Sequence, residues 1–340
     1  LMDFDSGMIL ASSNKDLTLP PASITKMMTA YIAFTELKEK NVLLNEDVLV
    51  SKKAWKTGGS KMFIEVGKQI KFKDILQGVI TVSGNDASVA LAEHISGDEN
   101  TFAIYMNQVA KNIGLINTNY TNSTGLPNDS LYTTAEDIAL LSRSLISNFP
   151  DLYKLYSTKS FKFNDIKQYS RNKLLFIDDN VDGIKTGFTN AAGYCLASSA
   201  KRGNRRLIAV VMGAPTPDVR IQSSRTLLEY GFRFFETHKL FKKDTEISKA
   251  RVYGGEKSEV KFGVNRDRSV TIPRRQKKNL KYQYVIDKKL TAPINQNETI
   301  GFMHVKLNDE IVQTYKLTAL ESVNEGSLYR RTVDSLLMDL

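Results

Sequence analysis

Two reactive side chains, Ser23 and Lys26, stand three residues apart in the stretch Pro-Ala-Ser-Ile-Thr-Lys-Met-Met-Thr. On a helix this spacing puts both side chains on one face, so that the lysine amine lies near the serine hydroxyl. A serine hydroxyl is a weak nucleophile until a neighbouring base removes its proton. Ser23 and Lys26 are therefore a candidate nucleophile and a candidate general base.

A lysine acts as a base only when its amine is neutral, and this requirement constrains the site. Its ordinary pKa of about 10.4 must fall by roughly 3 units near pH 7, which corresponds to about 4 to 5 kcal/mol. The positive end of a helix supplies only about 1 kcal/mol of this. Burial and a nearby second cation must supply the rest, so the pair predicts another lysine in the same cleft.

The Ser-x-x-Lys spacing alone does not identify a catalytic site, because short motifs recur by chance. The sequence repeats it at Ser12/Lys15, Ser170/Lys173, Ser198/Lys201 and Ser258/Lys261.

Two further motifs could complete the site. Ser83-Gly84-Asn85 lies between an apolar stretch and a helical pattern, where its simplest interpretation is a helix N-cap. Lys185-Thr186-Gly187 lies in a predicted strand, whereas Lys56-Thr57-Gly58 repeats the same letters in a predicted loop.

The elements around these motifs predict one α/β domain over residues 1–237. The residues after Lys26 are apolar with few interruptions, which indicates a helix buried on most sides and hence a rigid platform. Alternating segments at 193–200 and 205–214, joined by a polar turn, predict a hairpin in an antiparallel sheet. Residues 218–237 form a long amphipathic helical pattern.

The character of the chain changes near residue 238. Short strand patterns predict a small all-β domain over 238–325. Residues 326–340 begin an amphipathic helix with Val333, Leu336, Leu337 and Leu340 on one side. Such a helix can lie on a membrane surface or dock on its own domain, and the pattern alone does not decide between the two.

Composition narrows the class of protein. The 340 residues are 41% hydrophobic and 25% charged, which is typical of globular chains. The one cysteine, Cys195, excludes an intrachain disulfide and a Cys-x-x-Cys metal site. No apolar run approaches the roughly 20 residues that span a bilayer. The chain begins with Leu1 and has no leader pattern, so we expect any signal peptide to precede it.

The net charge of +10 is concentrated in the C-terminal part. Residues 1–200 hold 20 Lys and Arg against 21 Asp and Glu, whereas residues 201–340 hold 27 against 16. A basic surface can meet nucleic acid, anionic lipid or an anionic polymer. No nucleic-acid-binding motif accompanies it, so we expect no nucleic-acid partner.

In chain order, the three motifs match the signature of class A β-lactamases and penicillin-binding proteins. Residues 21–29, 83–87, 181–187 and 230–236 moreover resemble the low-molecular-mass D-alanyl-D-alanine carboxypeptidases, the penicillin-binding protein 5/6 type. The resemblance covers nearly the whole chain. It implies an α+β catalytic domain, with an antiparallel sheet flanked by helices, followed by a small β-sandwich domain and the start of a terminal amphipathic helix.

The resemblance also implies catalytic roles. Ser23 would attack the carbonyl between two D-alanines and form an acyl-enzyme, with Lys26 as general base. Ser83 would pass a proton to the departing D-alanine, and Asn85 would hold the peptide amide. Lys185 would be the second cation, whose charge helps to lower the pKa of Lys26.

Substrate-binding roles follow from the same resemblance. The backbone N–H groups of Ser23 and Phe188 would form an oxyanion hole. Thr186 and Arg220 would bind the terminal carboxylate, beside Gly187 of the same motif. Residues 58–60, ending at Ser60, would border the cleft as a mobile loop.

As partners the resemblance implies peptidoglycan pentapeptide stems and β-lactam antibiotics, with no cofactor and no metal. It implies a periplasmic location on the outer face of the cytoplasmic membrane, with attachment through the C-terminal helix. A β-lactamase is the nearest alternative, but the sequence has no Glu-x-x-x-Asn pattern in the expected loop. A penicilloyl sensor or wall-binding module is a further alternative, and it would stay acylated without releasing D-alanine.

Overall fold

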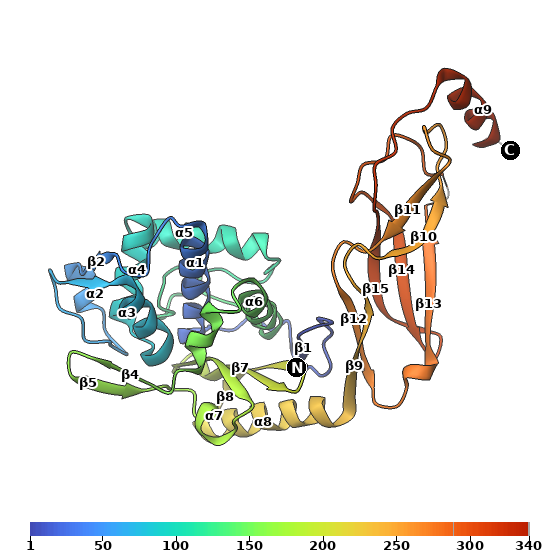
Figure 1. Cartoon of the computed structure of the whole chain (residues 1–340). Helices are drawn as coiled ribbons and strands as arrows, with labels where there is room; N and C mark the ends of the chain where they lie inside the picture. Colours follow the sequence, from blue (N-terminus) through green and yellow to red (C-terminus); the bar gives the residue numbers. More distant parts are fainter. Residues whose placement is uncertain (288, 339–340) are drawn as a thin grey trace. The chain divides into compact units, whose positions relative to one another are not determined.

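The structure, a computed structural model, describes residues 1–287 and 289–338 and divides the chain into two units (Figure 1). The first unit consists of Leu1–Phe4 and Ile9–Phe232, and the second consists of Asp5–Met8 and Arg233–Leu340.

An antiparallel sheet in the order β1-β8-β7-β6 forms the centre of the first unit. Its strands are β1 (Met2–Asp3), β6 (Val181–Thr189), β7 (Gly193–Arg202) and β8 (Arg205–Ala214). The β7-β8 hairpin turns at the polar residues predicted to join it, with Arg202 paired to Arg205. Strand β6 pairs with β7 so that Lys185 faces Ala197 across the ladder.

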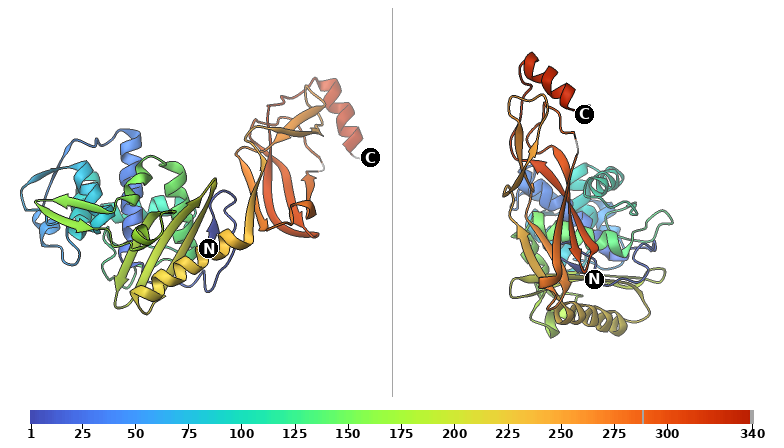
Figure 2. Two further views of the ribbon diagram at one scale, coloured as in Figure 1. Left: turned by 60° about the horizontal axis from the view of Figure 1, so that its bottom comes forward. Right: turned by 90° about the vertical axis from the view of Figure 1, so that its right-hand side faces the viewer.

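Helices cover both faces of this sheet, and Figure 2 shows the long helix α8 along one side and helices from the N-terminal half of the chain on the other. On one face, α1 (Lys26–Glu39) and α6 (Ala135–Asn148) share a core with Ile184, Ala197 and Ile208. On the other face, α7 (Leu174–Ile177) and α8 (Pro217–Phe234) pack on Leu196, Leu207 and Ala209. Alternate residues of each strand thus enter two separate cores.

Shorter elements complete the first unit around α1. They are the 3-10 helices η1 (Ala22–Thr25) and η3 (Leu152–Ser157), the π-helix η2 (Gly78–Val82), α2 (Lys52–Lys56), α3 (Phe72–Gln77), α4 (Asn85–Ser96) and α5 (Glu99–Asn112), with β2 (Asp47–Leu49), β3 (Gln69–Lys71), β4 (Ser160–Phe163) and β5 (Ile166–Tyr169).

The second unit is built from strands and one terminal helix. A sheet in the order β10-β11-β15-β14-β13 packs with the β12-β9 pair around one core that includes Met303, Val305 and Leu317. The elements are β9 (Phe235–Phe241), β10 (Glu246–Arg251), β11 (Glu259–Gly263), β12 (Arg268–Pro273), η4 (Lys277–Asn279), β13 (Leu280–Ile286), β14 (Thr299–Leu307), β15 (Glu310–Ala319) and α9 (Leu328–Met338).

The division between the two units lies a few residues before the predicted boundary at residue 238. The structure divides the chain at Arg233, because β9 begins at Phe235 and pairs with β12 from Pro273 onward. Residues Asp5–Met8 also belong to the second unit, where Ser6 Oγ lies 2.6 Å from Thr271 Oγ1. The predicted terminal helix 326–340 is α9 over Leu328–Met338, and its last two positions lie outside the described residues.

Candidate active site

Ser23 lies on η1, one turn before Lys26 begins the buried helix α1. Lys26 is only 1% exposed, and its Nζ lies within hydrogen-bond distance of Ser23 Oγ, at 3.0 Å. Strand β6 approaches η1 so closely that a Cβ on Gly187 would lie 2.9 Å from the Pro21 oxygen. Glycine at this position therefore lets the Lys-Thr-Gly strand lie beside the serine.

Lys26 is held by two further acceptors. Its Nζ donates to Asn85 Oδ1 and to the Thr124 carbonyl oxygen, each at 2.6 Å. Burial lowers the pKa of Lys26 well below its usual value, and the positive charge of Lys185 lowers it further, against the opposing charge of Asp86. The environment therefore favours the neutral amine that a general base requires.

The second motif reaches the cleft from the end of the π-helix η2. Ser83 adopts a left-handed backbone conformation with φ 61°, which ends η2 and starts the turn into α4. Ser83 Oγ accepts a hydrogen bond from Lys185 Nζ at 2.8 Å. The two serines are thus each bonded to a different lysine.

Lys185 lies in the middle of β6 and is 3% exposed. Burial lowers its pKa to about 7, with smaller contributions from the nearby charges of Arg171 and Arg220. Its Nζ also donates to the Thr186 oxygen at 3.2 Å. The structure therefore places a second lysine in the cleft, as the pKa argument requires.

The residues after Lys185 form one wall. Phe188 is 48% exposed, and its ring stacks on Tyr194 with centroids 4.3 Å apart. Arg220 is 7% exposed and donates to the Cys195 oxygen at 3.3 Å, while its Nε is buried without a hydrogen-bond partner. The positive charge of Arg220 contributes to the site because it lowers the pKa of Lys185. Thr186 is 7% exposed beside these groups.

The loop of residues 58–60 borders the cleft through its backbone. Asn85 Nδ2 donates to the Gly58 oxygen at 2.7 Å, and the Asn85 N–H donates to the Ser60 oxygen at 2.7 Å. Ser60 therefore contributes a carbonyl group to the site. A Cβ on Gly59 would lie 2.5 Å from Asn85 Nδ2, so the loop needs glycine to close on Asn85.

Sequence reasoning missed three contributors to this site. The Thr124 carbonyl binds Lys26, Arg171 lowers the pKa of Lys185, and Asp86 raises that of Lys26. A carbonyl carries no residue signature, and Arg171 lies within one of the chance Ser-x-x-Lys matches, which does not mark the arginine. Asp86 directly follows Asn85, so its position next to the Ser-Gly-Asn motif was the one sequence feature that could have pointed to it.

No group of three or more His, Cys, Asp or Glu side chains that could hold a metal ion occurs within residues 1–287 and 289–338. Among these same residues, no helix is both long and apolar enough to cross a bilayer.

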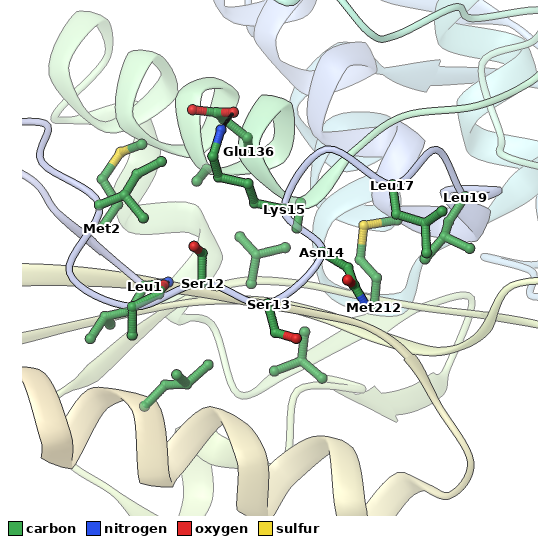
Figure 3. Close-up of a pocket in the computed structure, with 17 residues that line it drawn as sticks. Leu1, Met2, Ser12, Ser13, Asn14, Lys15, Leu17, Leu19, Glu136 and Met212 are labelled. Atoms are coloured by element: carbon green, nitrogen blue, oxygen red, sulfur yellow. Dashed lines mark hydrogen bonds and ion pairs between the residues drawn. The ribbon is translucent and has the colours of Figure 1, made fainter.

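A separate cavity of about 470 Å³ lies in the first unit, lined by the segment Ile9–Leu19, α6 and β8 (Figure 3). Lys15 and Glu136 form an ion pair at its wall. Its lining includes Ser12 and Lys15, one of the repeated Ser-x-x-Lys pairs, but not Ser23, Lys26, Ser83, Asn85 or Lys185.

The chain matches the family model described as D-alanyl-D-alanine carboxypeptidase over residues 1–216 and the model described as penicillin-binding protein 5, C-terminal domain, over residues 235–325. The chain belongs to the D-alanyl-D-alanine carboxypeptidase family. It is 43% identical to the D-alanyl-D-alanine carboxypeptidase DacC of Escherichia coli (strain K12), over 99% of this chain and 86% of that protein.

Solved structures agree with this assignment. Penicillin-binding protein 5 from Haemophilus influenzae is similar with a TM-score of 0.90 and 42% identity, over 95% of this chain and 96% of that one. Penicillin-binding protein D2 from Listeria monocytogenes, solved in an ampicillin-bound form, is similar with a TM-score of 0.63 and 30% identity, over 68% of this chain and 95% of that one.

These comparisons confirm several predictions. The family, the α+β fold with its C-terminal all-β domain, and the enzyme class of a serine-type D-Ala-D-Ala carboxypeptidase are those expected from the motifs. The protein is thus a hydrolase of the penicillin-binding class that acts on peptidoglycan. The individual roles of Ser23, Lys26, Ser83, Asn85 and Lys185 remain predictions.

Proposed function

We propose that this carboxypeptidase removes the terminal D-alanine of peptidoglycan pentapeptide stems through an acyl-enzyme on Ser23. The observation that carries the proposal is the 3.0 Å contact between Ser23 Oγ and Lys26 Nζ, at a lysine whose pKa is lowered by burial. This is the geometry of a nucleophile within reach of its base.

In the first step, Lys26 takes the proton of Ser23 as the oxygen attacks the carbonyl between the two D-alanines. The backbone N–H groups of Ser23 and Phe188 stabilise the negative charge that develops on the carbonyl oxygen. The carbon–nitrogen bond then breaks, and the departing amine receives a proton through Ser83, which is bonded to Lys185. Water hydrolyses the resulting ester.

The substrate's terminal carboxylate suits the cationic end of the cleft. Lys185 lies near enough to Arg171 and Arg220 for both charges to lower its pKa, and Thr186 is the next residue along the strand. Because a peptide that ends in D-alanine carries its negative charge next to the scissile bond, these cations would orient it. Asn85 would hold the peptide amide while its Oδ1 keeps Lys26 in place.

We further propose that β-lactam antibiotics acylate Ser23. A β-lactam presents a strained amide and a nearby carboxylate to the same groups. The ampicillin-bound structure of the Listeria monocytogenes relative supports this proposal. Acylation by a fluorescent penicillin should therefore compete with a D-alanyl-D-alanine peptide and disappear in Ser23→Ala.

The decisive assay is release of D-alanine from a soluble pentapeptide that ends in D-alanyl-D-alanine. Turnover by the wild-type chain, abolished in Ser23→Ala, supports the carboxypeptidase mechanism. Stable acylation by penicillin without release of D-alanine would instead indicate a sensor. Turnover that survives in Ser23→Ala would remove this serine from the mechanism.

We also propose that the protein works in the periplasm, on the outer face of the cytoplasmic membrane, with α9 on the lipid surface. Leu328, Tyr329, Leu336 and Leu337 of α9 are between 46% and 81% exposed. The polar side of α9 docks on its own unit instead, because Asp334 accepts a hydrogen bond from the Gly254 N–H at 2.7 Å. The outward apolar side is what an interfacial helix requires.

Flotation with vesicles of phosphatidylethanolamine and phosphatidylglycerol tests the membrane proposal. We expect the wild-type chain to float with the vesicles and a Leu336→Asp/Leu337→Asp variant to remain in solution. An equal distribution of the two proteins would contradict attachment through α9.

A further inference from the structure

Asp86 is a buried carboxylate next to the catalytic cleft that the motifs do not assign. It is 1% exposed and occupies the first turn of α4. Its Oδ1 accepts hydrogen bonds from the Met62 N–H at 2.8 Å and from the Ala87 N–H at 2.9 Å. Its Oδ2 accepts from the Phe63 N–H at 2.9 Å and from the Ile64 N–H at 3.3 Å.

Three of these four donors are consecutive amides of one loop. A carboxylate that accepts several backbone N–H groups is stabilised in its charged form, and the donors are fixed in turn. Phe63 has φ 68°, a left-handed conformation that a bulky residue seldom adopts. The hydrogen bonds from the loop amides to Asp86 therefore maintain a loop conformation that is unfavourable by itself.

The same loop also bonds to Asn85. The oxygens of Gly58 and Ser60 accept the side-chain and backbone N–H groups of Asn85, each at 2.7 Å. Asn85 Oδ1 in turn accepts from Lys26 Nζ at 2.6 Å. A continuous set of hydrogen bonds thus runs from Asp86 through the loop and Asn85 to Lys26.

We propose that Asp86 is a positioning residue, which closes the loop of residues 58–64 on Asn85 and thereby fixes the Asn85 oxygen that holds Lys26. The proposal rests on the proposed function, because Lys26 must be the base for its position to matter. Asp86 itself does not contact the reacting atoms.

The charge of Asp86 gives the proposal a second, independent consequence. Its negative charge raises the pKa of Lys26, whereas burial and Lys185 lower it. The other charged groups of the cleft are Arg171 and Arg220, which act on Lys185. Removal of the carboxylate charge should therefore lower the pKa of Lys26 further and leave the surrounding cations in place.

The test compares Asp86→Asn with wild type in the full chain. The asparagine keeps the shape, but it presents an NH₂ group to the loop amides and carries no charge. We expect kcat for D-alanine release to fall at least about tenfold, as for a misplaced catalytic group. We also expect the acid limb of the rate of acylation by penicillin to move to lower pH. Glu65→Gln, an exposed carboxylate of the same loop region, is the matched control and should change neither.

Asp86→Glu separates position from charge. It keeps the negative charge on a longer side chain, so kcat should fall while the acid limb stays within experimental error of wild type. Wild-type kcat and an unmoved acid limb in Asp86→Asn would overturn the proposal. A wild-type chain that releases no D-alanine would instead refute the proposed function, so the two failures are distinguishable.

Amide hydrogen exchange in the wild-type chain tests the hydrogen bonds between the loop and Asp86 even if neither variant folds. The N–H groups of Met62, Phe63 and Ile64 should exchange as slowly as those within α4, because all three are bonded to a buried carboxylate. Rapid exchange at these three amides, comparable with that of exposed loop amides, would overturn the proposal.

Discussion

The same four-residue motif occurs in both units of this protein with opposite outcomes. Ser23 and Lys26 lie at the start of a buried helix, where their side chains meet at 3.0 Å and burial lowers the pKa of the lysine. Ser258 directly precedes β11 and Lys261 lies within it, where Lys261 pairs with Glu246 at 2.9 Å and its pKa is raised by that carboxylate.

The difference shows that the environment of the lysine, and not the motif, sets the direction in which its pKa shifts. Three residues along a helix bring two side chains to one face, whereas three residues along a strand send them to opposite faces. Lys261 is also exposed to solvent and paired with a carboxylate. Both surroundings favour the charged ammonium form of the lysine. The predictions below use this comparison.

The largest expected difference in activity is between the variants of Ser23 and Ser258. Ser23→Ala should lower the rate of D-alanine release by more than about a thousandfold, because the nucleophile is lost. Ser258→Ala should leave the rate unchanged. A D-alanine assay on both variants measures the contrast, and equal activities would contradict it.

The next largest contrast is expected between substitutions of Lys26 and Lys261. Lys26→Met should slow acylation by penicillin by about 10² to 10⁴, the usual contribution of a general base, while the apolar contacts of α1 preserve the fold. Lys261→Met should acylate at the wild-type rate. Stopped-flow kinetics with a fluorescent penicillin measure both, with circular dichroism to check folding. A Lys26→Met protein that acylates at the wild-type rate would exclude Lys26 as the base.

Substitution of Lys185 should have a smaller effect on activity, and it should shift the acid limb of the pH profile in one defined direction. In the wild type, we expect activity to rise with pH as Lys26 loses its proton and to decline as Lys185, whose pKa burial lowers to about 7, loses its charge. Lys185→Met removes a positive charge that keeps the pKa of Lys26 low, so the acid limb should move to higher pH. The ratio kcat/KM should fall by about tenfold to a hundredfold at pH 7, as for a lost charged hydrogen bond. An acid limb that moves to lower pH would contradict this account.

The smallest effect on catalysis should come from the core of the second unit. Met303 is fully buried there, so Met303→Ala should cost about 2 to 5 kcal/mol of the free energy of unfolding of that unit. Hydrolysis of a small soluble peptide should keep its wild-type kcat. Thermal unfolding and the D-alanine assay, run on one preparation, measure the two quantities. A large fall in kcat would show that the second unit takes part in catalysis.

Much of the fold was predictable from local patterns. The buried helix after Lys26, the β7-β8 hairpin and the strands β11 to β15 of the second unit follow from hydrophobic periodicity and turn residues, whereas β9 and β10 were not predicted. The boundary between the units was placed at residue 238 because β9 continues the apolar pattern of α8. Its pairing with β12, which assigns it to the second unit, is a long-range contact without a local signal.

The site was predictable where side chains act and unpredictable where the backbone acts. Ser23, Lys26, Ser83, Asn85 and Lys185 carry reactive groups at recognisable spacings, and the structure brings them together. The Thr124 carbonyl and the loop amides held by Asp86 depend on how distant segments fold together. Any residue type can supply such groups, so no motif marks them.

Mass spectrometry after exposure to penicillin tests the central claim most directly, namely that the hydroxyl beside Lys26 is the nucleophile. The account predicts a single penicilloyl adduct per chain, on the peptide that contains Ser23, and no adduct in Ser23→Ala. An adduct on any other residue, or its persistence in Ser23→Ala, would contradict the account.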